Sequence, residues 1–367
     1  MLPSLLSYPL DIRRAGRLLA ISEPHDTNTN ERAPITLQML SDRLLIGRGR
    51  YLATFAHAAQ VLNRRLIIRC PKQQLAHIAR TTFGRIALAN TATVWQSNRS
   101  PITNQGLLLT DSPVDQTNPE SPIATELLVG RDAIAKTLAM PFPMHPNVQP
   151  YATDELLSQL RFTVSRTGIF LAGCETGKTR ADIGKQPQKE LLCHEQVVRT
   201  IHDHFGDRIA RALHSDGHRV PILIGDARDS SLGSEDWLRR LAQCDFLLCP
   251  PAARQCFNHH LVEAMSVGTI PIVEYGRRLS PALQNGLNAI YFEGADGLCD
   301  AIRRVDRLSP PEVAALRGNV VNYYEKHMRI DHFLDLLGQN RRDIPIVSLP
   351  FHDRNLFDEG RFTKAAA

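Results

Sequence analysis

The chain has 367 residues and a net charge of +5, with 43% hydrophobic and 22% charged residues. This composition is typical of a globular protein long enough for two domains, and it excludes a disordered chain. The basic residues are spread out without a Lys/Arg tract, so nothing indicates nucleic-acid binding, whereas a phosphorylated ligand or an anionic membrane surface would suit the mild positive charge.

Seven cysteines, an odd number without a C-x-x-C pair, favour a reduced, cytoplasmic compartment. The N-terminal segment lacks a basic region and a full apolar core, so we expect no signal peptide, and no run approaches the ~18 apolar residues that span a bilayer. Any membrane contact is therefore expected to be peripheral. One group of residues has metal-binding side chains but fits no zinc module, and we interpret its thiols as buried and expect no metal: Cys244, Cys249, Cys256, His259 and His260.

The first half of the chain predicts an irregular series of elements. Short apolar runs indicate strands, and apolar residues at helical spacing indicate helices. We expect a helix over about 35–62, within which GRGR (47–50) is a break or a surface turn, and a second helix at 72–82. The predicted strands are 17–22, 65–70, 85–90 and 106–111, and the predicted loops are 23–34 and 112–122.

Prolines mark a break in composition at 140–153 (MPFPMHPNVQPYAT), which predicts an extended connector. We place a domain boundary there. The predicted organisation is an N-terminal α/β domain at 1–145, a C-terminal domain at 146–330, and a tail at 331–367 that packs back toward the N-terminal domain.

Apolar strands alternate with amphipathic helices in the second half. This order predicts a parallel sheet covered on both faces, a doubly wound α/β domain that binds ligands beyond the carboxyl ends of its strands. The predicted strands are 168–173, 220–226, 245–251, 269–275 and 288–292, and the predicted helices are 189–205, 234–242, 257–267 and 295–306.

Residues 172–179, AGCETGKT, have the spacing of a P-loop. A P-loop needs a helix directly after its Lys-Thr, but Gly184 and Pro187 follow and disfavour one. A Gly-rich loop at a strand end can still bind a diphosphate through backbone N–H groups and through Lys178 or Arg180. The loop is therefore either a phosphate-binding loop or a solvated surface loop.

The run 244–275 combines a buried strand, a polar loop and a buried helix. Asn258 is a good N-cap, so the helix start would offer its amides to an anionic group. Glu263 lies on the same helix face as His259, among apolar neighbours. A lone buried carboxylate is costly, so Glu263 should have a partner and favours a functional role. The histidines and Glu274 can also be ordinary surface residues.

This run resembles the C-terminal domain of GT-B glycosyltransferases, with the exostosin-like and retaining (group 1-like) groups as the most similar. The resemblance covers about 168–330. It implies an α/β fold with two Rossmann-like domains and a donor cleft between them. The pieces that carry it are ILIGD (222–226), CDFLLCPP (244–251), FNHHLVEAM (257–265), VGTIPIV (267–273), GLNAIYF (286–292) and YYEKHM (323–328).

The resemblance implies a nucleotide-diphosphate sugar as donor, without a cofactor or a bound metal. Glu263 matches the second glutamate of the family's E-x7-E motif, which contacts the nucleotide ribose. Gln255 stands where the family has its first glutamate, which puts retaining chemistry in doubt. The residues expected to bind the donor are Gly173, Lys178, Arg180, Asp226, Arg254, Gln255, Asn258, His259 and Glu263.

An inverting transferase needs a base on the N-terminal side to deprotonate the acceptor hydroxyl. The candidates are His25, Asp26 and Asp111, which follow predicted strands, with His145 in the connector as a further one. The acceptor implied is a glycan or a lipid-linked molecule, reached in the cytoplasm or at a membrane surface.

Two other functions stay open. One is a P-loop kinase or NTPase that uses 172–179, with Asp226 holding magnesium. The other is a degenerate nucleotide-sugar-binding module, which the Gln255 departure suggests.

Overall fold

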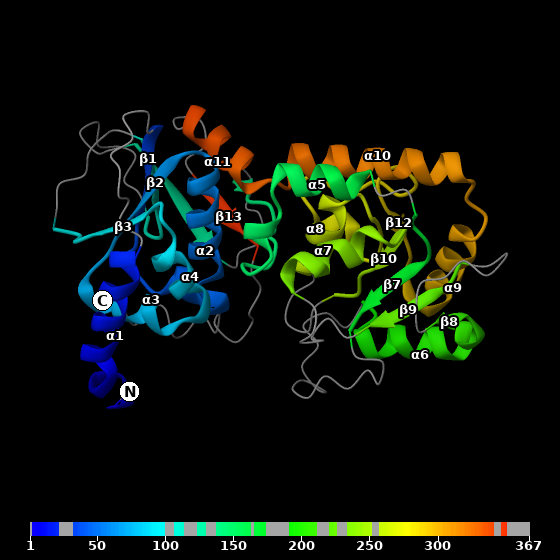
Figure 1. Cartoon of the computed structure of the whole chain (residues 1–367), viewed down its shortest axis with the longest axis horizontal. Helices are drawn as coiled ribbons and strands as arrows, with labels where there is room; N and C mark the ends of the chain where they lie inside the picture. Colours follow the sequence, from blue (N-terminus) through cyan, green and yellow to red (C-terminus); the bar gives the residue numbers. More distant parts are fainter. Residues whose placement is uncertain are drawn as a thin grey trace. The chain divides into compact units, whose positions relative to one another are not determined.

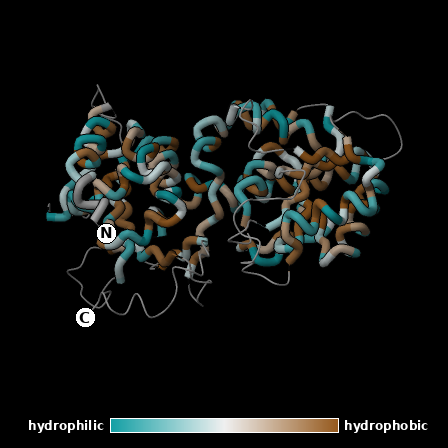
Figure 2. The backbone as a smooth tube through the Cα atoms, turned by 90° about the horizontal axis from the view of Figure 1, so that it is seen from below, coloured by the Kyte–Doolittle hydropathy of each residue, from teal (hydrophilic) through white to brown (hydrophobic). Residues whose placement is uncertain are grey.

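The computed structural model describes residues 2–21, 32–99, 106–113, 123–129, 137–162, 165–173, 191–210, 220–225, 233–251, 257–340 and 346–350. These form two compact units, each with its own sheet (Figure 1). Of the described residues, unit 1 contains 2–149 and 329–350, and unit 2 contains 150–328. Hydrophobic stretches run through the interior of each unit (Figure 2).

Unit 1 contains a parallel sheet in the order β3-β2-β1-β4-β5-β13-β6. The interior strand β1 pairs with β2 and β4, and it is buried at Ile35 and Leu37. The strands are β1 (Arg32–Gln38), β2 (Arg64–Arg69), β3 (Thr93–Gln96), β4 (Leu107–Thr110), β5 (Ala124–Val129), β6 (Leu138–Ala139) and β13 (Ile346–Leu349).

The helices of unit 1 pack beside β1–β3 and on one another (Figure 1). Asp11 of α1 is buried and accepts a hydrogen bond from Arg80 of α3, which fixes α1 on the unit. The helices are α1 (Leu2–Ile21), the 3-10 turn η1 (Arg43–Leu45), α2 (Ile46–Val61), α3 (Lys72–Arg80), α4 (Thr82–Ala89) and α11 (Ile330–Gln339).

Three predicted elements of unit 1 are wrong. Residues 17–22 were expected to form a strand, but 17–21 end helix α1, and 85–89 of the expected strand 85–90 lie in α4. A short apolar run does not distinguish strand from buried helix, and in α4 the Thr81 hydroxyl caps the helix by accepting from Gly84 N. Conversely, 35–38 belong to β1 instead of the expected helix, because a central parallel strand is apolar without alternation.

The break predicted at GRGR is confirmed. Gly47, Arg48 and Gly49 all have left-handed φ angles, of 63°, 62° and 80°. Gly49 also lies so close to α4 that a Cβ would be 2.8 Å from Gly84 N, so a side chain has no room there. The regular part of α2 therefore begins at Arg50.

Unit 2 contains a second parallel sheet, in the order β12-β11-β10-β7-β9-β8. Both units are thus Rossmann-like α/β domains, and the predicted fold class is confirmed. The strands are β7 (Ile169–Ala172), β8 (Ile209–Ala210), β9 (Ile222–Gly225), β10 (Phe246–Leu248), β11 (Ile270–Val273) and β12 (Ile290–Tyr291).

Helices cover both faces of this sheet. α6 packs with α9, while α8 packs with α7 and α10 on the opposite face (Figure 1). None of the described helices is long and apolar enough to cross a membrane. The elements are the 3-10 turns η2 (Gln149–Tyr151), η3 (Gly206–Arg208) and η4 (Gly276–Arg278), and the helices α5 (Asp154–Arg161), α6 (His194–Phe205), α7 (Ser234–Ala242), α8 (His259–Ser266), α9 (Gly294–Val305) and α10 (Pro310–His327).

Two half-buried arginines fix the carboxyl end of α8. Arg161 Nε donates to Ser266 O at 2.8 Å, and Arg166 donates to Val267 O at 2.8 Å. Cations at a helix carboxyl end complement the helix dipole. Burial lowers the pKa of Arg166 to about 10, so it is still charged at neutral pH. The opposite, amino end of α8 is therefore held at the carboxyl edge of the sheet.

Candidate functional site

The carboxyl ends of β7 and β10 form the topological switch point of unit 2. β7 pairs with β9 on one side and with β10 on the other, and the chain reaches these neighbours in opposite directions. Doubly wound sheets bind ligands at such a point. The loop after β7 begins at Gly173, and the loop after β10 leads to α8. Both loops that sequence reasoning selected therefore leave the sheet at this edge.

Glycine is the only residue type that fits at position 173, where the first loop starts. Its φ is 156°, and a Cβ would lie 2.1 Å from Cε1 and 2.4 Å from Nε2 of His194. His194 is the first residue of α6, so its ring covers the end of β7. No motif in the sequence pointed to His194.

The first turn of α8 faces the same edge. Asn258 is its N-cap, as predicted, and the side-chain oxygen accepts a hydrogen bond from His260 N at 3.1 Å. The amino end of a helix carries partial positive charge and unpaired amides, which favour an anionic group.

Glu263 lies one turn further along α8 and is fully buried. The partner that its burial required is Trp237 of α7, whose indole Nε1–H donates to Glu263 Oε2 at 2.7 Å. Trp237 is itself 7% exposed and contacts the rings of Phe170 and His260. Sequence reasoning missed Trp237 because its place on an amphipathic helix indicates only a core residue.

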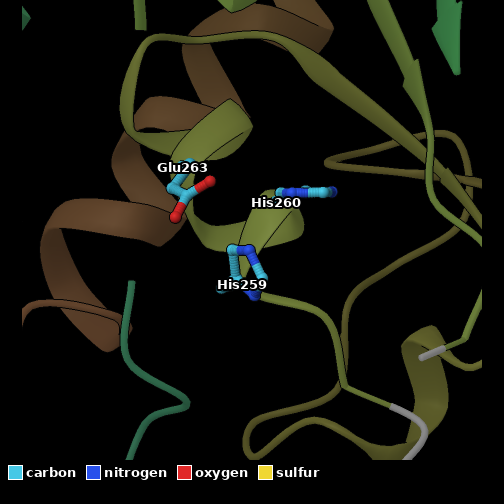
Figure 3. Close-up of side chains that lie close together, drawn as sticks. All are labelled: His259, His260 and Glu263. Carbon is cyan, nitrogen blue, oxygen red and sulfur yellow. The ribbon is translucent and has the colours of Figure 1, made fainter. Parts of the chain in front are cut away.

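His259, His260 and Glu263 are the one group among the described residues whose ligand atoms approach closely enough for a metal ion, within 4.8 Å of one another. Figure 3 shows the three side chains on the first turns of α8. Two imidazoles and a carboxylate are groups that commonly bind Zn²⁺. Two features oppose a cation there: the positive end of the helix dipole, and the engagement of Glu263 Oε2 by Trp237.

Glu274 has an anchoring role at the end of β11. One carboxylate oxygen accepts from Leu192 N at 2.6 Å and the other from Gly294 N at 2.8 Å, which ties the starts of α6 and α9 to the sheet. Nearby, Cys249 Sγ lies 3.1 Å from Tyr275 Oη, and burial raises the pKa of this thiol to about 12. Cys249 is thus the buried thiol that the sequence predicted.

Asp111 in unit 1 follows β4 and is 1% exposed. Its carboxylate accepts three hydrogen bonds, from Leu40 N (2.7 Å), Ser41 N (3.0 Å) and Ser41 Oγ (2.8 Å). These donors favour an anchoring role for Asp111 over that of a proton-accepting base.

His145 packs edge-on against Phe83, and its Nδ1 accepts from Asn147 N at 3.2 Å. Burial, with the charge of Arg50 adding to it, lowers the pKa of His145 to about 4. The ring is therefore neutral at pH 7.

The other predicted site residues lie outside the part of the chain that the structure describes. They are His25, Asp26, Lys178, Arg180, Asp226, Arg254 and Gln255, together with Cys256.

Comparison with known proteins gives likeness at the level of structure only. No family model matches the sequence, and no curated protein matches it. Solved structures that are similar include a glycosyltransferase from Rickettsia africae ESF-5, with 12% identity over 86% of this chain and 99% of that chain and a TM-score of 0.45. HepE from Anabaena, solved in complex with UDP, has 10% identity over 83% and 98%, with a TM-score of 0.39. WaaG, a glycosyltransferase involved in lipopolysaccharide biosynthesis, has 11% identity over 82% and 99%, with a TM-score of 0.36. At these identities and TM-scores, no residue's role is transferred to this chain.

Proposed function

We propose that the chain is a glycosyltransferase of the GT-B type that moves a sugar from a nucleotide-diphosphate donor to a hydroxyl acceptor. One observation carries the proposal: Gly173 ends β7 at the β7/β10 switch point, and the amino end of α8 and the buried Glu263 follow β10 there. Departure of a diphosphate needs its developing charge stabilised, and amides at a helix start with nearby cations supply this. The order of motifs along 168–330 points to the same chemistry.

In this proposal the diphosphate lies at the first turn of α8, which Asn258 caps. Lys178, Arg180 and Arg254 supply positive charge from the two loops. Glu263 contacts the ribose, and because it is fully buried, the first turn of α8 must rearrange when the donor binds. Trp237 keeps one carboxylate oxygen in place during that change.

The finer parts of the proposal concern the whole enzyme. The donor would bind without a tightly held metal, and the acceptor would be a glycan or a lipid-linked molecule. The mild positive charge suits a peripheral contact with an anionic membrane in the cytoplasm. The exostosin-like group remains the more specific family hypothesis.

A panel of UDP-, GDP- and ADP-sugars tests the proposal by thermal shift and calorimetry, each with EDTA and with added Mg²⁺ or Zn²⁺. We expect one nucleotide to bind in EDTA. Glu263→Gln should weaken binding about 10-fold or more, because it removes a charge-assisted hydrogen bond worth about 1.5–3 kcal/mol. Glu325→Gln, which alters an ion-paired carboxylate on α10, is the matched control.

If no nucleotide sugar stabilises the protein, the proposal of a transferase is overturned. Binding that requires Mg²⁺ and disappears in Lys178→Ala, but survives Glu263→Gln, would favour the P-loop kinase. Binding without hydrolysis or transfer would favour the degenerate binding module.

A further inference from the structure

Helix α1 packs on unit 1 with one side. Asp11 and Ala15 are buried on this side, and the helix contacts α3, α4 and β3 (Figure 1). Asp11 is the only acidic residue of α1, and its carboxylate accepts a hydrogen bond from Arg80 of α3. The helix itself therefore contributes no negative charge to its outer side.

The outer side of α1 is cationic around one apolar residue. Leu10, Arg13, Arg14 and Arg17 have the spacing i, i+3, i+4 and i+7, which places them on one helix face. Leu10 is 60% exposed and the side chain of Arg14 is 45% exposed, and Arg13 and Arg17 are exposed as well. These four residues are called the α1 face below.

The neighbours of the α1 face on the same helix are small. Pro9, Gly16 and Ala20 are exposed beside it. A Cβ placed on Gly16 would meet no atom within 4 Å. A broad, flat partner can therefore approach the α1 face without meeting a long side chain from the rest of the helix.

The combination of an exposed leucine with three arginines suits a lipid surface. At such a surface the apolar side chain and the arginine stems enter the interface, while the guanidinium groups stay at the level of the phosphates. Each basic residue close to an anionic membrane strengthens binding about fivefold. A nucleic-acid duplex would use the arginines for its phosphates but would leave Leu10 in water.

We propose that the α1 face docks on an anionic phospholipid surface, with Leu10 at the upper acyl chains and Arg13, Arg14 and Arg17 at the lipid phosphates. The inference rests on the peripheral membrane contact in the proposed function, and it assigns that contact to named residues. Docking of α1 brings unit 1 to the surface that would hold a lipid-linked acceptor.

Sedimentation with vesicles tests the arginines. The unaltered protein should bind vesicles that contain phosphatidylcholine and phosphatidylglycerol in equal parts, and bind phosphatidylcholine alone far more weakly. Added salt should weaken the binding, because it screens the charges. Replacing Arg13, Arg14 and Arg17 together by glutamine should weaken it about 100-fold. Glutamine has nearly the helix propensity of arginine, so circular dichroism should show the fold retained.

The matched control removes three arginines elsewhere. Arg199, Arg239 and Arg303 are exposed on helices of unit 2, and each is ion-paired within its own helix. Their replacement by glutamine changes the net charge by the same amount as the α1 variant. Binding of this control to the mixed vesicles should stay within about threefold, because charges far from the contact are screened.

Leu10 gives a separate readout of insertion. Leu10→Ser should weaken vesicle binding about 10-fold, because less apolar area leaves water. Leu10→Trp should gain an emission that brominated lipids quench, beyond any quenching of the unaltered protein, whose tryptophans lie on β3 and α7. A Leu10→Trp protein that binds the vesicles without this added quenching would overturn the proposed contact.

The docking proposal and the transferase fail in different ways. Equal binding of the two triple variants, no binding of the unaltered protein, or a preference for a nucleic-acid duplex over the mixed vesicles would overturn the docking proposal. The vesicle assays contain no nucleotide sugar and the nucleotide-sugar panel contains no lipid. A failure of the vesicle assays therefore leaves the transferase standing, and a failure of the panel removes the transferase while the measured docking remains.

Discussion

The hydrogen bond between Trp237 and Glu263 gives a quantitative prediction for the stability of unit 2. In Trp237→Phe the carboxylate of Glu263 stays buried but loses its indole donor, and in Glu263→Met the indole N–H stays buried without its acceptor. A lost hydrogen bond to a charged group costs about 1.5–3 kcal/mol, and an orphaned buried donor about 1–3 kcal/mol. Each single variant should therefore unfold more easily by these amounts.

The double variant should lose much less stability than the sum of the losses in the two single variants. With both partners apolar, neither polar group is left buried alone, and such replacements are nearly neutral. The smaller ring of phenylalanine costs the same in the single and double variants, so it cancels in the double-mutant cycle. We expect a coupling free energy of about 1–3 kcal/mol.

Urea unfolding followed by circular dichroism measures these free energies. The chain contains two tryptophans, Trp95 in unit 1 and Trp237 in unit 2. In every variant that lacks Trp237, fluorescence therefore reports unit 1 alone and should give the same midpoint. Additive costs, with a coupling below about 0.5 kcal/mol, would refute the claim that Trp237 holds Glu263.

Three further predictions concern stability. Gly173→Ala should destabilise unit 2 by about 1–3 kcal/mol, because the new Cβ meets the His194 ring and the φ is one that side chains rarely adopt, and His194→Ala should recover part of the loss in thermal melts; no recovery would contradict the steric part of the explanation. Asp111→Asn, made in the Trp237→Phe protein so that Trp95 fluorescence in urea reports unit 1 alone, should destabilise unit 1 by about 1–3 kcal/mol, because the charge that binds the amides of Leu40 and Ser41 is lost. The pKa of His145 is about 4 when folded and about 6.5 when unfolded, so the unfolded chain binds more protons between these values and unit 1 should lose about 1–3 kcal/mol as the pH falls from 6.5 to 4. His145→Phe should flatten that dependence, and an unchanged slope would contradict it.

Unit 2 was predictable from the sequence because its signals are local and agree. Strands such as β10 and β11 are buried along their whole length, and each reads as an apolar run between amphipathic helices. The cap at Asn258 and the need of Glu263 for a partner also follow from single positions. The identity of that partner does not follow from the sequence, because the direction of the Trp237 indole N–H depends on how α7 packs on α8.

Unit 1 was less predictable because tertiary contacts decide its elements. Residues 17–21 are helical since Asp11 and Ala15, one turn apart, bury that face of α1. The contact between Asp42 Oδ2 and His77 Nδ1, at 3.0 Å, joins two segments that carry no shared motif. The strand β13 gave no signal as a partner of β5, because nothing local connects Ile346 to Glu126.

The position of β13 has a consequence for synthesis of the chain on the ribosome. Unit 2 is continuous in sequence over its described residues, but β13 is the last described strand and inserts between β5 and the edge strand β6 of unit 1's sheet. Until Leu349 has emerged, β5 presents an unpaired edge, and such edges pair readily with other chains. The sheet of unit 1 is therefore completed only after the chain of unit 2 has been made.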